Sequence, residues 1–148
     1  MNQPRARTMA QQITGCSVVL TDNPDGWYQH PGFIEIPRGK GRKEALIHEV
    51  CHWVVANDLE RKEENLGMPK DPQVDQLSLS KVMRELREQQ ACFLQKILYA
   101  MDGREVPRNP SCRFRLMVPL GVDHSKWVFD RAREIGWEKL YVLVSRPW

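Results

Sequence analysis

The sequence predicts an α+β fold in which a short, mostly antiparallel sheet packs on two long helices. Three observations predict it: two β-rich segments near the N-terminus, two long segments with apolar residues at helical spacing, and turn residues between these segments. The chain has 148 residues, of which 41% are hydrophobic and 28% are charged, as in an ordinary globular domain. We therefore expect a single domain over residues 13–148, with its core at about 16–103.

The N-terminal part is expected to contain an arm and two strands. Residues 1–12 are polar and aperiodic, which predicts a flexible arm. Residues 16–20 are rich in β-branched side chains and end at a run of turn residues, and residues 32–36 alternate apolar with polar before Pro37. We expect the second strand to be half exposed and near a sheet edge, where an extended substrate could add as a further strand.

Two long helices are expected in the middle of the chain. Residues 43–61 contain no Gly or Pro, and their apolar side chains recur at helical spacing. A second segment keeps that spacing up to Met101; Ser78 or Ser80 would cap its start, and Asp102-Gly103 would end it. Both segments are long enough to pack side by side.

The C-terminal part is expected to be a strand, a helix and a strand, together spanning about residues 113–145. Residues 113–118 and 140–144 are the predicted strands, because both are short and rich in apolar and β-branched side chains. Asp123 or Ser125 would cap the helix between them, which would end at Gly136.

Charge, cysteines and hydropathy exclude some classes of protein. The chain has 22 Lys and Arg and 19 Asp and Glu, so its charge is nearly balanced. Arg5, Arg7 and the basic cluster at 38–43 are not interleaved with aromatic residues, so the sequence does not support nucleic-acid binding. The four cysteines form no C-x-x-C pair, which indicates a reducing compartment. No run of residues approaches the ~20 apolar residues that a membrane span needs. We expect a cytoplasmic protein of a bacterium or an infected cell, with a virus particle as the alternative location.

The first helix carries a motif with its own chemistry, His48-Glu-Val-Cys-His52, which fits H-E-x-x-H. Histidines four residues apart lie one turn apart on the same face, so both imidazoles can reach one Zn²⁺ at about 2.0–2.1 Å. Glu49 is rotated by about 100° from His48, so it can contact a metal-bound water but cannot join as a ligand. The alternative is a pair of buried histidines that only fill the core.

A catalytic zinc usually takes three protein ligands, so a third must come from elsewhere. We favour Glu88 on the second helix, because a small residue one turn later would let the two helices approach closely. Glu85 on nearly the same face could orient a histidine instead or be the ligand, and His124 is a further candidate. Under the alternative interpretation, both glutamates are solvated charges paired with Arg84 and Arg87.

Two other residues near the motif are interpreted structurally. Asp58 would complete the pattern H-E-x-x-H-x-x-G-x-x-D, but the β-branched Val55 stands where that pattern needs a glycine. We therefore expect Asp58 to end or cap the continuing helix. Cys51 is expected to be a small buried hydrophobe.

The order of these segments is similar to that of a known family. The strand at 32–37, the run Leu46-Ile-His-Glu-Val-Cys-His-Trp53 and Glu88-x-x-Ala91 resemble the short gluzincin-type zinc metallopeptidases, most of all the ImmA/IrrE type of bacteria and mobile elements. The resemblance covers about residues 30–100. Gln90 stands where an acidic residue is often found, and Cys51 where a glycine is common.

The resemblance implies a zincin-like fold and a metallopeptidase site. It implies His48, His52 and Glu88 as zinc ligands and Glu49 as the catalytic carboxylate. The implied reaction is hydrolysis of a peptide bond in a protein or peptide substrate by a zinc-activated water, with Glu49 as general base. The alternative is a structural or interaction protein that binds zinc without turnover, such as a component of a phage particle or a partner of a regulator.

Overall fold

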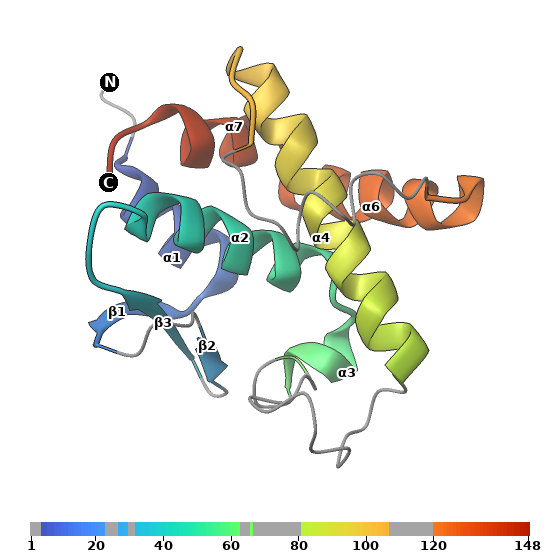
Figure 1. The fold of residues 1–148 in the computed structure, drawn as a ribbon, viewed down its shortest axis with the longest axis horizontal. Coiled ribbons are helices and arrows are strands. Elements are labelled where there is room, and N and C mark those ends of the chain that lie inside the picture. Colours follow the sequence, from blue (N-terminus) through green and yellow to red (C-terminus); the bar gives the residue numbers. More distant parts are fainter. Residues whose placement is uncertain (1–3, 23–26, 30–31, 63–65, 67–80, 107–119) are drawn as a thin grey trace.

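The computed structural model describes residues 4–22, 27–29, 32–62, 66, 81–106 and 120–148. These parts of the chain combine helices with a small sheet (Figure 1). The strands are β1 (Ser17–Thr21), β2 (Trp27–Gln29) and β3 (Phe33–Pro37). The helices are α1 (Ala6–Thr14), α2 (Arg42–Val55), α3 (Asp58–Arg61), α4 (Lys81–Met101), α6 (Val122–Ile135) and α7 (Trp137–Ser145). None of these helices is long and apolar enough to cross a membrane.

The sheet is mixed, with strand order β1-β3-β2. β1 runs parallel to β3, with Val18 opposite Ile34, and β2 runs antiparallel to β3, with Tyr28 opposite Ile34. The two predicted strands are therefore confirmed, but the expectation of a mostly antiparallel sheet is wrong. The expectation that β3 lies at an edge is also wrong, because β1 pairs with one of its sides and β2 with the other.

Helix α2 covers the sheet and forms the centre of the core. Ile34 and Ile36 of β3 are completely buried, and so are Leu46, Ile47 and Val50 of α2. Cys51 is also completely buried, and burial raises the pKa of its thiol, so its interpretation as a small core residue is confirmed.

The first long helix ends earlier than predicted. The sequence predicts that it reaches residue 61, but Ala56 is extended and Asn57 is the N-cap of the separate short helix α3. Asn57 and Glu60 form a capping box: the Glu60 amide donates to Asn57 Oδ1 at 2.8 Å, and the Asn57 amide donates to Glu60 Oε1 at 3.3 Å. Asp58 is therefore the first residue of α3 and does not end or cap α2.

Helix α4 crosses α2 and packs against it (Figure 1). Its apolar face is buried through Ala91, Leu94 and Leu98. The prediction of a second long helix is confirmed up to Met101 and Asp102-Gly103, whereas the two predicted caps, Ser78 and Ser80, lie outside the described residues.

Helix α1 is packed against the core, so the expectation of a flexible arm over residues 1–12 is wrong from Ala6 onward, and residues 1–3 lie outside the described residues. In α1 the side chains of Ala6, Met9, Ala10 and Ile13 are buried, which is the i, i+3, i+4, i+7 spacing of one helical face. The Ala6 amide also donates to the Pro147 carbonyl at 2.9 Å, so α1 is held against the C-terminal end of the chain.

The C-terminal part is helical where it is described. The predicted helix is confirmed as α6, with Gly136 at its C-cap, but its N-cap is Gly121, so neither Asp123 nor Ser125 caps it. The predicted strand at 140–144 is wrong, because these residues lie in α7. Leu140, Val142, Leu143 and Val144 are all buried there, and such a continuous apolar run has no period that separates strand from helix. The predicted strand at 113–118 lies outside the described residues.

Candidate metal centre

The side chains of His48, His52 and Glu88 converge between α2 and α4. The Nε2 atoms of the two histidines are 3.1 Å apart, His52 Nε2 lies 2.6 Å from Glu88 Oε1, and His48 Nε2 lies 3.9 Å from Glu88 Oε2. One donor atom from each residue lies within 4.8 Å of the others, and no second cluster of this kind occurs in the part of the chain that the structure describes. The favoured third residue, Glu88, is therefore the one that meets the two histidines.

The sequence produces this cluster in two steps. Four-residue spacing on α2 places the imidazoles on one face, with ring centroids 4.6 Å apart and ring planes at 84°. The small Ala91 lies in the buried face of α4, one turn after Glu88, so the second helix can approach closely enough for the carboxylate to reach both rings.

The donor set and its spacing fit a zinc ion. Two imidazole nitrogens and one carboxylate oxygen form a common catalytic zinc set. At zinc–ligand distances of about 2.0–2.1 Å, two ligand atoms on a tetrahedral ion lie roughly 3.3–3.4 Å apart. The separations of 3.1 Å between the two Nε2 atoms and 2.6 Å between His52 Nε2 and Glu88 Oε1 are both shorter than that value by less than one ångström, so small side-chain shifts would bring these pairs to the spacing of zinc ligands.

One side of the cluster is buried and the other is open. The side chain of His52 is only 6% exposed, whereas those of His48 and Glu88 are 24% and 23% exposed. His52 therefore lies at the inner end of the cluster, and His48 and Glu88 lie on its more exposed side.

The carboxyl group of Glu49 has a raised pKa. Burial is the main reason that its pKa rises to about 7, the negative charge of Glu88 adds to the rise, and His52 opposes it. Glu49 does not belong to the cluster of possible ligands. The two histidines of the motif therefore belong to the cluster, and Glu49 does not.

The other candidates for the site lie elsewhere. The Glu85 side chain is exposed on α4, and the group that lies next to His48 Nδ1 is Oε1 of Gln95, at 2.9 Å. His124 is exposed on α6, where its backbone carbonyl accepts a hydrogen bond from Gln90. Sequence reasoning missed Gln95, although it follows Glu88 by seven residues and so lies two turns later on the same face.

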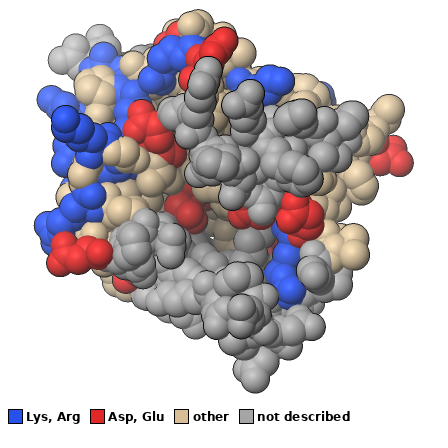
Figure 2. Space-filling view, viewed as in Figure 1, with Lys and Arg blue, Asp and Glu red and all other residues tan. Residues whose placement is uncertain are grey.

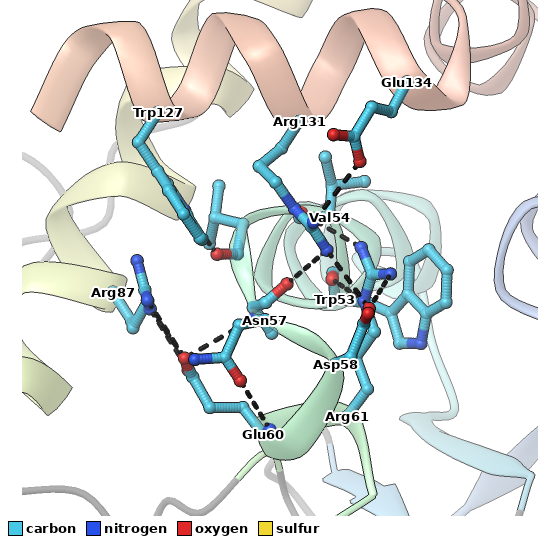
Figure 3. Close-up of polar contacts among 12 residues, drawn as sticks. Trp53, Val54, Asn57, Asp58, Glu60, Arg61, Arg87, Trp127, Arg131 and Glu134 are labelled. Carbon is cyan, nitrogen blue, oxygen red and sulfur yellow. Dashed lines mark hydrogen bonds and ion pairs between the residues drawn. The ribbon is translucent and has the colours of Figure 1, made fainter.

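The C-terminal end of α2 is fixed by donors from α3 and α6 (Figure 3). The carbonyl of Trp53 accepts from Arg61 Nε at 2.9 Å, that of Val55 accepts from Trp127 Nε1 at 2.8 Å, and that of Ala56 accepts from Arg131 Nη2 at 2.8 Å. The last carbonyls of a helix have no partner within it, and positive charge stabilises that end. The turn that carries His52 is therefore held in place.

A buried ion pair connects α3 to α4 (Figure 3). Arg87 Nη2 lies 3.0 Å from Glu60 Oε1, both side chains are almost fully buried, and Arg87 Nη1 donates to Gln90 Oε1 at 2.7 Å. The guanidinium also lies over the Trp127 ring, 4.7 Å from its centroid. Arg87 thus belongs to an internal network, and no single spacing in the sequence connects it with Glu60.

Basic side chains gather on the side of the molecule that carries the connection between β3 and α2 (Figure 2). Several of them contact other parts of the chain. Arg7 donates to the Val18 carbonyl, Arg38 pairs with Asp22 at 3.2 Å, and Arg42 lies over the Trp148 ring. These three cations therefore have roles within the fold.

Comparison of the chain with protein-family models, with curated proteins and with solved structures gives no match. The case for a metal centre therefore depends on the positions of His48, His52 and Glu88 and on the chemistry of their donor atoms.

Proposed function

We propose that the protein is a zinc-dependent metallopeptidase with a zincin-like fold, in which His48, His52 and Glu88 hold the metal. The observation that carries the proposal is the approach of Glu88 to both histidines of the H-E-x-x-H motif, with 2.6 Å between His52 Nε2 and Glu88 Oε1. Two helices far apart in sequence supply the three donors, and a glutamate that is not one of them follows the first histidine.

Each side chain has a separate task in this proposal. A zinc ion would act as a Lewis acid and would lower the pKa of a bound water to about 7. Glu49 accepts a proton as water attacks the peptide carbonyl and then donates a proton to the leaving amine. Burial of His52 keeps the cluster rigid, and the partial exposure of His48 and Glu88 gives a peptide access.

The test compares the wild type with Glu49→Gln on a mixture of unfolded protein and peptide substrates. Because Glu49 is not among the possible metal ligands, this substitution should leave the zinc content unchanged. It should lower the cleavage rate by roughly 10²–10⁴-fold, the range for loss of a general acid–base group. Glu85→Gln, at an exposed position on α4, is the matched control and should cleave like the wild type.

Two outcomes would contradict the proposal. Equal cleavage by the wild type and Glu49→Gln would exclude the proposed role of that carboxylate. Zinc binding with no cleavage by the wild type would favour the alternative, a zincin-like structural or interaction protein that binds zinc without turnover.

A further inference from the structure

The side chain of Gln95 makes a specific contact behind the cluster. Its Oε1 atom lies 2.9 Å from Nδ1 of His48, on the side of the ring opposite to the atom that faces His52 and Glu88. Gln95 is only 5% exposed, so its amide must find partners inside the protein. The contact joins α4 to α2 two turns away from Glu88.

This contact determines where the proton of His48 lies. An amide oxygen can only accept a hydrogen bond, so Nδ1 of His48 is the donor. A neutral imidazole carries one proton, and a proton on Nδ1 leaves the lone pair on Nε2. Nε2 is the atom of His48 that faces the other two side chains of the cluster.

We propose that Gln95 is a positioning residue of the metal centre, which holds the His48 ring and its Nδ1–H tautomer so that Nε2 is ready to bind zinc. The inference rests on the proposed metal site and adds to it a residue that does not contact the metal. Histidine ligands generally need such a partner on the second ring nitrogen, and its loss typically weakens metal binding by about 10–100-fold.

Gln90 provides a matched comparison on the same helix. It is also almost completely buried, but its amide accepts from Arg87 and donates to the His124 carbonyl. Replacing Gln90 with leucine therefore removes buried hydrogen bonds without removing a partner of either motif histidine.

The test uses the full chain with Gln95→Leu, Gln95→Glu and Gln90→Leu. Zinc affinity is measured by competition with a chromophoric chelator, and the tautomer of His48 is read from ¹⁵N chemical shifts in the zinc-free wild type and variants.

We expect the Nδ1–H form in the wild type. Gln95→Leu should lose that preference and bind zinc about 10–100-fold more weakly. Gln95→Glu, which keeps an acceptor, should bind at least as tightly as the wild type. Gln90→Leu should lower the free energy of unfolding but should change neither the zinc affinity nor the tautomer of His48.

The outcomes separate this inference from the proposed function. An Nε2–H tautomer in the wild type, or equal zinc affinity in the wild type and Gln95→Leu, would overturn the role of Gln95 and leave the metal centre standing. Loss of affinity in Gln90→Leu equal to that in Gln95→Leu would also overturn it, because the effect would then come from packing alone. A wild type that binds no zinc would overturn the metal centre and this inference together.

Discussion

The Nε2 atom of His52 lies 2.6 Å from Oε1 of Glu88, and this contact joins helices α2 and α4 at the candidate metal centre. The histidine is almost fully buried, so its contact with Glu88 lies at the inner end of the cluster. The motif on α2 supplies two donors, and the packing of α4 supplies the third. The site is therefore a property of the helix pair, and its chemistry depends on how that pair is held.

Glu88→Gln should weaken zinc binding far more than Glu85→Gln. The first substitution replaces a carboxylate that contacts both histidines by a neutral amide, whereas the Glu85 side chain is exposed outside the cluster. We expect the affinity loss in Glu88→Gln to exceed the ~10–100-fold typical of an indirect partner, measured by chelator competition. A metal-bound structure with Glu85 or His124 as the third ligand would contradict this assignment.

Arg87→Leu should lower the free energy of unfolding by about 3–5 kcal/mol, because it leaves the Glu60 carboxylate buried without its partner. Urea unfolding measures the change. Lys96→Leu, at an exposed position on the same helix, is the control and should stay within about 0.5 kcal/mol of the wild type.

A second substitution checks the cause of that loss. Glu60→Gln keeps an oxygen for the capping box with Asn57 but removes the buried charge. In the Arg87→Leu background it should therefore recover part of the lost stability. No recovery would mean that the charge of Glu60 is not what makes the loss of Arg87 costly.

Tyr99 should make the fold less stable at high pH. The folded protein holds the phenol proton up to about pH 12, whereas an unfolded tyrosine releases it near pH 10. Between these values the unfolded chain binds fewer protons than the folded one, so the free energy of unfolding falls as pH rises. Compared with Tyr99→Phe in urea unfolding, the wild type should lose additional stability above pH 10. A constant difference between the two proteins up to pH 11 would contradict this prediction.

The local signals in the sequence predicted the cluster of His48, His52 and Glu88 better than they predicted the fold around it. Helical geometry alone relates His48, Glu49 and His52, so four-residue spacing was enough to place both rings on one face. The choice of Glu88 depended on an inference about how the two helices pack, and the small Ala91 was the basis of that inference. Gln95 and Arg87 act through contacts between helices, and no spacing in a single segment specifies such partners.

The wrong predictions of secondary structure have specific causes. The apolar side chains of α1 have helical spacing, but they are few and stand among polar residues, which hid the helix. The run at 140–144 is apolar throughout, so its β-branched residues suggested a strand although tertiary packing makes it helical. The sequence contains a signal for the end of α2 that the prediction overlooked. Asn57 followed three residues later by Glu60 is the pattern of a capping box, which marks the start of a new helix.

Zinc content tests the central claim most directly. Wild-type protein, His48→Ala, His52→Ala and His124→Ala are each equilibrated with zinc, freed of excess metal and measured by elemental analysis. We predict one zinc per chain in the wild type and in His124→Ala, whose exposed histidine lies outside the cluster, and none in the two motif variants. Wild-type protein that takes up no zinc, or motif variants that keep it, would contradict the account.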